Sequence, residues 1–218
     1  MISEKQRLSR VQVLGLCAMA IAVLVIANDF TSLSVALPAI EEEFSSDVTT
    51  VQWIITGYAL VFGVLIVTGG RLADMFGRRR IFLVGASLFT VFSVQAGLAT
   101  DVWMLIAARG LMGVGGALMW PAVLGMTYGL LPPGREALGG SLIMTAAGMG
   151  NASGPLLGGA LTDYVSWRWI FLLNLPVTLI ARLVTWRVVA ADEKRPGDRH
   201  LDYSGVVMLS IGLLALLY

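Results

Sequence analysis

The stretch GGRLADMFGRRR, residues 69–80, places four arginines, one aspartate and three glycines in twelve positions between two long apolar runs. The chain as a whole is 57% hydrophobic and 13% charged, whereas ordinary soluble domains carry roughly 25% charged residues. Its mean hydropathy is +0.81. A short charged turn between two runs of membrane-spanning length predicts a hairpin of two transmembrane helices.

The same pattern of apolar block and polar turn continues along the chain. Six blocks reach the roughly 20 residues that a bilayer crossing needs: Val11–Pro38, Thr49–Gly70, Ile81–Ala99, Val102–Leu131, Ala137–Thr162 and Trp169–Ala190. Continuous runs with internal glycine and no period-2 alternation favour helices over a β-barrel. We therefore expect an all-α membrane protein whose loops are short, except at Glu41–Val48 and at a polar linker.

The expected organisation has four parts. Residues 1–10 form an N-terminal segment, residues 11–190 hold the six spans, residues 191–202 form the linker, and residues 203–218 begin a seventh span. A span that stops about sixteen residues after it begins, short of the roughly 20 that a crossing needs, suggests a fragment or a truncated reading frame.

The basic residues predict the orientation. If every block crosses the membrane, all basic residues outside the spans except Arg168 fall on one side, and the acidic residues Glu41, Glu42, Glu43, Asp47, Asp101 and Asp163 fall on the other. Because cytoplasmic loops carry an excess of lysine and arginine, the N-terminus and the linker are expected in the cytoplasm. The sequence thus predicts a multi-pass protein of the cell membrane.

Several function classes are disfavoured. The net charge is +1 and no basic face suits nucleic acid. The single Cys17 permits no internal disulfide, and the single His200 lies in the linker, away from any nucleophile–base or metal-spaced cluster. No phosphate-binding loop is present to support ATP-driven pumping. We expect no enzyme, no metal and no cofactor, which leaves the lipid bilayer and a small-molecule substrate as partners.

Asp29 is the only acidic residue well inside a predicted span, and Arg109 is a basic residue inside another, and such residues indicate a functional site by default. Counted from the span ends at 1.5 Å per residue, Asp29 lies about 13 Å deep and Arg109 roughly 9 Å deep. Arg109 alone could extend its charge to the interface. The similar depths favour an ion pair or a shared water-filled cavity.

Two further stretches have both a simple explanation and a functional one. The arginines of residues 69–80 are explained by topology alone, but Asp74 is an acid on the side where acids have no role in topology. It can pair with the neighbouring arginines or accept from a helix end. Gly150, Gly154 and Gly158 form a stripe for close helix packing, beside Pro155, which bends the helix.

These motifs resemble those of the major facilitator superfamily. Gly70–Arg80 is similar to the signature between spans two and three, matching at Gly70, Leu72, Ala73, Asp74, Gly77, Arg78 and Arg79, with Met75 where a basic residue is common. The stretch 105–115 is similar to the span-four motif at Leu105, Arg109, Gly113 and Gly115, with Met112 in place of the usual glutamine.

A narrower resemblance points to drug/proton antiporters. The pattern G-x-x-x-G-P-x-x-G-G of their fifth span matches at Gly150, Gly154, Pro155, Gly158 and Gly159. Asn28–Pro38, Trp167–Pro176 and Leu201–Leu214 resemble stretches of the fourteen-span branch, with Ser34 where asparagine is usual. The tryptophans also suit a belt at the membrane interface.

The resemblance implies a fold and a set of roles. The fold is the six-helix N-terminal half of a major facilitator transporter, built from two inverted repeats of three spans, plus the start of a seventh helix. Asp29 would carry or sense the proton, and Arg109 would tune it. Gly70, Asp74, Gly77, Arg78 and Arg79 would form a conformational latch against the C-terminal half. Trp53, Met119 and Trp120 are expected at the substrate cavity from their positions in the spans.

The predicted function is proton-coupled export of drugs or other small amphipathic compounds. Import by symport within the same superfamily is one alternative, which the antiporter pattern at Gly150–Gly159 disfavours. The other is a truncated half-transporter without independent transport, which would need the missing C-terminal half or a second chain as its partner.

Overall fold

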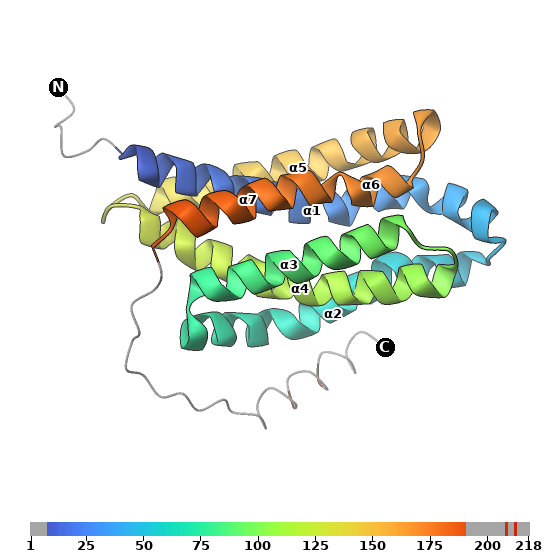
Figure 1. Ribbon diagram of the computed structural model, residues 1–218, viewed down its shortest axis with the longest axis horizontal. Coiled ribbons are helices and arrows are strands. Elements are labelled where there is room, and N and C mark those ends of the chain that lie inside the picture. The colour runs from blue at the N-terminus through green and yellow to red at the C-terminus, as the bar shows by residue number, and fades with distance from the viewer. Residues whose placement is uncertain (1–7, 191–207, 209–211, 213–218) are drawn as a thin grey trace.

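The computed structural model describes residues 8–190, together with Met208 and Gly212, and arranges them as a bundle of long helices (Figure 1). The helices are α1 (Arg10–Phe44), α2 (Val48–Phe76), α3 (Arg78–Gly97), α4 (Val102–Leu130), α5 (Glu136–Tyr164), α6 (Arg168–Leu172) and α7 (Asn174–Val188). The described residues contain no strand, which confirms the predicted all-α fold. Residues 1–7 and the linker at 191–202 lie outside the described part, as do all but two positions of the expected seventh span.

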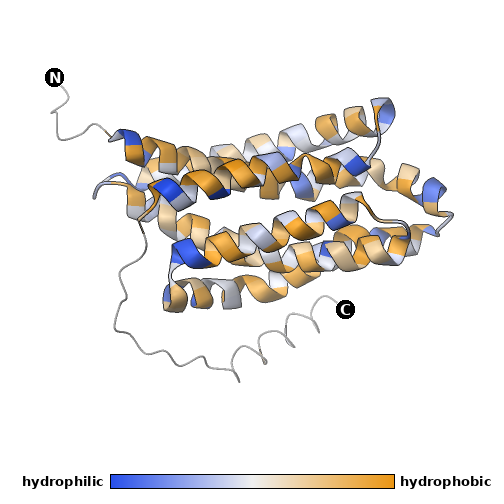
Figure 2. Ribbon diagram, viewed as in Figure 1, coloured by the Kyte–Doolittle hydropathy of each residue, from blue (hydrophilic) through white to orange (hydrophobic). Residues whose placement is uncertain are grey.

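Five described segments are long and apolar enough to cross a membrane: α1, α2, α3, α4, and α6 with α7 taken together as Arg168–Val188. Leu173 joins the last two with a near-helical backbone (φ −67°, ψ −24°). The 29-residue α5 is long enough, but its glycine, serine and asparagine residues lower its hydropathy. Figure 2 shows apolar residues along the helices and polar ones gathered toward their ends.

The helix ends follow local capping rules. Ser9 and Gln12 form a reciprocal capping box at the start of α1, and Asp47 caps α2 by accepting from the Thr50 amide at 2.9 Å. Gly77 separates α2 from α3 with φ 99°, a left-handed conformation that favours glycine. The expected loop at Glu41–Val48 is wrong in extent. α1 continues through Phe44, past the internal Pro38, because a proline bends a helix without having to end it.

The packing pairs the two expected repeats, α1–α3 and α4–α7. α1 packs against α5, the second helix of the other repeat, and α4 packs against α2 in the equivalent way. The third helices meet as well, since α3 contacts α7. In Figure 1, α1, α5, α6 and α7 form one row and α2, α3 and α4 the other. This crossed pairing is the arrangement that inverted repeats produce.

Candidate functional site

The centre of the bundle holds an ion pair. Arg109 of α4 is 0% exposed and Asp29 of α1 is 1% exposed. The Arg109 Nη1 donates to Asp29 Oδ2. Taking two charges out of water is costly unless they are paired and further hydrogen-bonded. The structure thus brings Asp29 and Arg109, which the sequence places inside different spans, together at the interface between the repeats.

Further groups satisfy the guanidinium of Arg109. Its Nε donates to the Ile54 carbonyl of α2 at 3.1 Å. Its Cζ lies 4.1 Å from the centroid of the Tyr58 ring and 5.8 Å from that of Phe171. A cation over an aromatic face is attracted by the negative face of the ring, most strongly where water is excluded. Arg109 is therefore held by α2 as well as by Asp29.

The carboxylate of Asp29 has a second partner that sequence reasoning did not identify. The Asn174 Nδ2 donates to Asp29 Oδ1 at 3.2 Å and to the Ser93 Oγ at 3.1 Å. Ser93 in turn donates to the Phe171 carbonyl at 2.8 Å. The signal was available, because Asn174 is a lone amide inside the apolar stretch WRWIFLLNLP, and a polar residue within a span marks a functional position.

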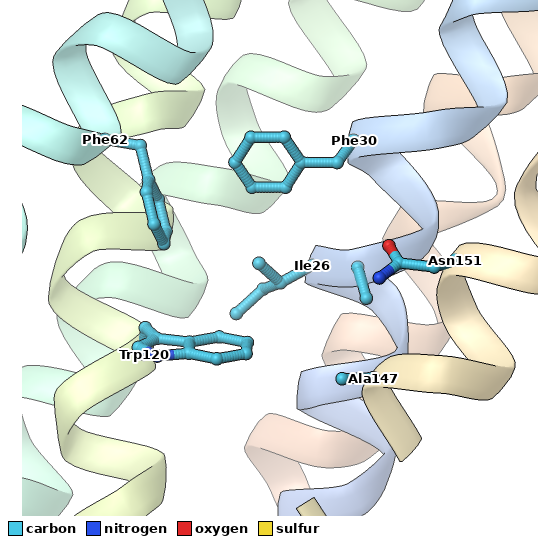
Figure 3. A pocket seen from close by; sticks show the side chains of 7 residues that line it. Ile26, Phe30, Phe62, Trp120, Ala147 and Asn151 are labelled. Atoms are coloured by element: carbon cyan, nitrogen blue, oxygen red, sulfur yellow. The ribbon is translucent and has the colours of Figure 1, made fainter. Parts of the chain in front are cut away.

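An aromatic cavity of about 460 Å³ includes Phe30, the residue that follows Asp29 along α1, in its lining (Figure 3). It is lined by α1, α2, α4 and α5 through Ile26, Ala27, Phe30, Phe62, Trp120, Ala147 and Asn151. The rings of Phe30 and Phe62 meet edge to face at 5.4 Å, and those of Phe62 and Trp120 at 6.4 Å. The lining is apolar and aromatic apart from the amide of Asn151, and it carries no charged side chain.

Trp53, Met119 and Trp120 were expected at the cavity from their positions in the spans, and they lie in three different places. Trp120 lines the cavity. Met119 is fully buried on another face of α4, where it packs close to Gly85 of α3. Trp53 lies near the start of α2, 37% exposed and outside the cavity lining.

The glycine stripe of α5 packs directly on α1. A Cβ at Gly150 would lie 2.5 Å from the Leu24 carbonyl oxygen, and Cβ atoms at Gly154 and Gly158 would come still closer to Thr31 and Ser32. Gly159 is looser, with its nearest neighbour Val35 at 3.6 Å. The small residues let two backbones approach in a way that larger side chains would prevent.

A hydrogen bond crosses the same seam. Pro155 has no amide proton, so the carbonyl of Asn151, four residues earlier, lacks its helical donor. The Thr31 Oγ1 of α1 donates to this carbonyl at 3.2 Å. A side chain of α1 therefore supplies the hydrogen bond that the Asn151 carbonyl, at the bend of α5, lacks within its own helix.

The segment 69–80 is helical except at Gly77, because α2 continues to Phe76 and α3 begins at Arg78, and its arginines tie it to the bundle. Arg78 pairs with Asp74 at 3.3 Å and donates to the Gly125 carbonyl of α4 at 2.9 Å. Arg79 donates to the Trp186 carbonyl of α7. Gly70 lies against Pro121 of α4, whose Cβ would be 3.5 Å from an added Cβ.

The opposite end of the bundle has a clasp around Arg168, the one basic residue expected on that side. Its Nη1 donates to Glu43 Oε1 at 2.6 Å, and its Nη2 donates to the Ala99 carbonyl at 2.8 Å. Trp167 donates from its indole to Glu43 Oε2 at 2.7 Å. The clasp joins the end of α1, the turn between α3 and α4, and the start of α6.

Membrane-length helices paired as inverted repeats around a buried ion pair and an aromatic cavity define a multi-pass membrane protein of the transporter class. The family model of the Major Facilitator Superfamily matches residues 19–216. The chain belongs to this superfamily, as its motifs predicted. This assignment agrees with the expectation of a membrane transport family and not of an enzyme family.

Curated relatives agree with this assignment. The chain is 37% identical over 93% of its length to the tetracenomycin C resistance and export protein of Streptomyces glaucescens, covering 38% of that protein. It is 38% identical over 94% of its length to a puromycin resistance protein of Streptomyces alboniger, covering 41%. It is also 35% identical to the multidrug resistance protein Stp of Mycobacterium tuberculosis over 97% of its length, covering 39%. The chain thus spans about two fifths of these relatives.

A solved structure supports the fold alone. The peptide transporter POT in complex with sulfate superposes with a TM-score of 0.73 at 17% identity, over 93% of this chain and 44% of that one. The match confirms that the six-helix arrangement is that of a known transporter fold.

Proposed function

We propose that the chain forms the N-terminal half of a proton-coupled exporter of drugs or other small amphipathic compounds, in the cytoplasmic membrane. The observation that carries the proposal is the Asp29–Arg109 pair, sealed in the bundle next to an aromatic cavity. The relatives named above, which are resistance and export proteins, support export as the direction.

The pair supplies the chemistry that proton exchange needs. An ionised Asp29 is compensated by Arg109 and by the amide of Asn174. When the carboxyl binds a proton, the ion pair is lost and Arg109 keeps the Ile54 carbonyl and the Tyr58 ring as partners. In the proposed cycle the site alternates between these two states, one with the proton and one without it. Antiport requires such alternation between proton and substrate.

Three further proposals follow from this function. A second six-helix body would close the cavity on its open side, supplied either by more of the same polypeptide or by a second chain. The end of α2 around Asp74, whose side chain is 60% exposed, would contact that body as a latch. The bundle end that holds Gly77 and Arg78 would face the cytoplasm together with the N-terminus, as the distribution of basic residues predicts.

Everted membrane vesicles that carry the protein, expressed from its native gene, test the proton role. A pH gradient is imposed and substrate-driven proton movement is followed with a pH-sensitive dye, using puromycin and tetracenomycin C as probes. We expect Asp29→Asn to abolish the proton movement, because the amide cannot exchange a proton. The matched control is Asp163→Asn, at an exposed acid near the end of α5. Unchanged proton movement with Asp29→Asn would refute the proposal.

A further inference from the structure

Tyr58 occupies the space between the cavity and the ion pair. It lies one helical turn before the cavity residue Phe62 on α2, so the two side chains share a face of the helix. Its ring is 0% exposed. A Cβ at Gly116 of α4 would lie 3.0 Å from its hydroxyl oxygen, so a glycine there makes room for the phenol.

The ring contacts both neighbours. On the cavity side it meets Phe30 edge to face at 4.7 Å and stacks on Phe62 at 6.1 Å. On the other side the guanidinium of Arg109 lies 4.1 Å from its centroid. Phe30 is also the residue that follows Asp29 along α1. A change in the position of Phe30 or Phe62 is therefore transmitted by direct contact to the surface on which Arg109 rests.

The coupling between the cavity and the ion pair does not come from charged groups in the cavity. The cavity lining contains no ionisable side chain. The titratable groups that face Asp29 are Arg109 of α4 and Tyr58 of α2, whereas α7 and α3 contribute the neutral Asn174 and Ser93. Occupancy of the cavity can reach the ion pair through packing, and Tyr58 is the side chain that touches both.

We propose that Tyr58 is the positioning residue that couples the cavity to the Asp29–Arg109 pair, and that the ligand is a planar aromatic molecule. The inference rests on the proposed function. Three edge-to-face rings, those of Phe30, Phe62 and Trp120, offer faces for stacking a flat ring system. A ligand stacked there holds Phe30 and Tyr58 in the arrangement described, and this arrangement holds Arg109 against Asp29.

The proton step follows from this contact. With Arg109 held in place, the O–H bond of a protonated Asp29 carboxyl breaks, and its proton passes to solvent water once helix movement opens a path to the site. The carboxylate that forms becomes the partner of the guanidinium. Ligand binding therefore releases a proton without any residue of the cavity changing its charge.

Ethidium is a suitable probe, because it is planar, aromatic, fluorescent and without a proton to release near neutral pH. The chain is purified in detergent in weakly buffered solution. Ethidium binding is measured by fluorescence, and proton release is measured with an indicator dye. We expect the wild-type protein to release protons as ethidium binds.

Three variants separate coupling from binding. Tyr58→Leu removes the ring beneath Arg109, and we expect the protons released per bound ethidium to fall several-fold, because the desolvated cation–π contact no longer holds the guanidinium in place. Phe76→Leu is the matched control on the same helix, because its ring is exposed and outside the cavity lining. We expect it to leave both ethidium binding and the protons released per bound ethidium unchanged. Tyr58→Phe restores the ring and should restore proton release.

Each outcome tests a different part of the proposal: the ligand class, the proton coupling or the role of Tyr58. Absence of ethidium binding to the wild-type protein overturns the aromatic ligand class. Binding without proton release by the wild-type protein overturns the proposed proton coupling itself. Wild-type proton release that persists in Tyr58→Leu overturns the role of Tyr58 and leaves the proposed function standing. A Tyr58→Leu variant that fails to fold leaves Tyr58→Phe to decide, because failure of this variant to release protons contradicts coupling through the ring.

Discussion

Residues 8–190 contain two arginine–aspartate pairs that differ in almost everything except their chemistry. In the Asp29–Arg109 pair both side chains are at most 1% exposed and come from different helices. In the Asp74–Arg78 pair they are 60% and 38% exposed and lie four residues apart in sequence. Water and salt compete for the second pair and not for the first. The comparison teaches that an ion pair takes its importance from its surroundings.

The largest expected effect comes from breaking the buried pair. Arg109→Ala leaves the Asp29 charge buried without its partner, which costs about 3–5 kcal/mol of stability. Thermal unfolding in detergent, followed by tryptophan fluorescence, measures the loss. The double variant Asp29→Leu/Arg109→Met should recover most of it, since an apolar pair of similar volume needs no compensation. If Arg109→Ala lost no more stability than Asp74→Asn, the buried pair would not differ from the exposed pair in its contribution.

Asn174→Ala removes a hydrogen-bond partner of the buried pair, the amide that donates to Asp29. Its amide donates to a carboxylate, and hydrogen bonds to charged groups contribute about 1.5–3 kcal/mol. The matched variant is Asn28→Ala, whose amide donates to the neutral Ser153 hydroxyl at 3.2 Å. The same unfolding assay should show a smaller loss for Asn28→Ala. Equal losses would mean that the charge of Asp29 does not strengthen the contact.

Gly154→Ala tests whether the seam of α1 and α5 supports the helix that carries Asp29. The added methyl group meets Thr31 at a distance that no real contact allows, and overpacking of this kind costs about 1–3 kcal/mol. Gly148→Ala makes the same change on the same helix with nothing within 4 Å of the added carbon. Its melting temperature should stay the same or rise. A fall as large as that of Gly154→Ala would contradict the packing argument.

Asp74→Asn breaks the exposed pair, and the expected change in stability is small. Exposed ion pairs contribute about 0.2–1 kcal/mol and are screened by salt. Unfolding measured at low and high ionic strength should show the difference from wild type shrinking as salt is added. A loss independent of salt would show that Asp74 is held by more than its charge.

The smallest effect concerns Asp47, the cap of α2. Hydrogen bonds from the Thr50 hydroxyl and amide hold the pKa of its carboxyl below the ordinary value of 3.8. Its contribution to stability is therefore fully present above that value and is lost as the pH falls through the lower folded pKa. Melting temperature measured against pH should show a slight acid-side decline that Asp47→Asn removes. An identical decline in the variant would assign it to other carboxyl groups.

The fold was predictable from the sequence because the bilayer leaves few choices. Backbone groups in lipid must be satisfied within the segment, so long apolar blocks form helices. The helix ends were less predictable. α1 passes Pro38 and ends at Phe44, because the acidic run Glu41–Glu43 continues the helix and Glu43 finds Trp167 and Arg168 as partners.

The candidate site was predictable in part. Asp29 and Arg109 stand out as charges within apolar blocks, so the sequence identifies them. Which side chains surround them depends on helix rotation, and the apolar blocks carry little information about that. Met119 and Trp120 are neighbours in sequence, yet one packs against α3 and the other lines the cavity. Tyr58 and Asn174 acquire their roles only when the helices are assembled.

Hydrogen bonds from arginine side chains to backbone carbonyls of other segments bear on which basic residue the chain uses. Arg78, Arg79, Arg109 and Arg168 each donate to a backbone carbonyl contributed by another helix or turn. Three of them bind a carboxylate as well. A guanidinium has five donors in a planar fork, whereas an ammonium acts as a compact point charge on a flexible stem. The only two lysines of the chain, Lys5 and Lys194, lie outside residues 8–190, where every basic side chain is arginine. A codon change to lysine at any of these four positions would conserve the charge and lose the crosslink.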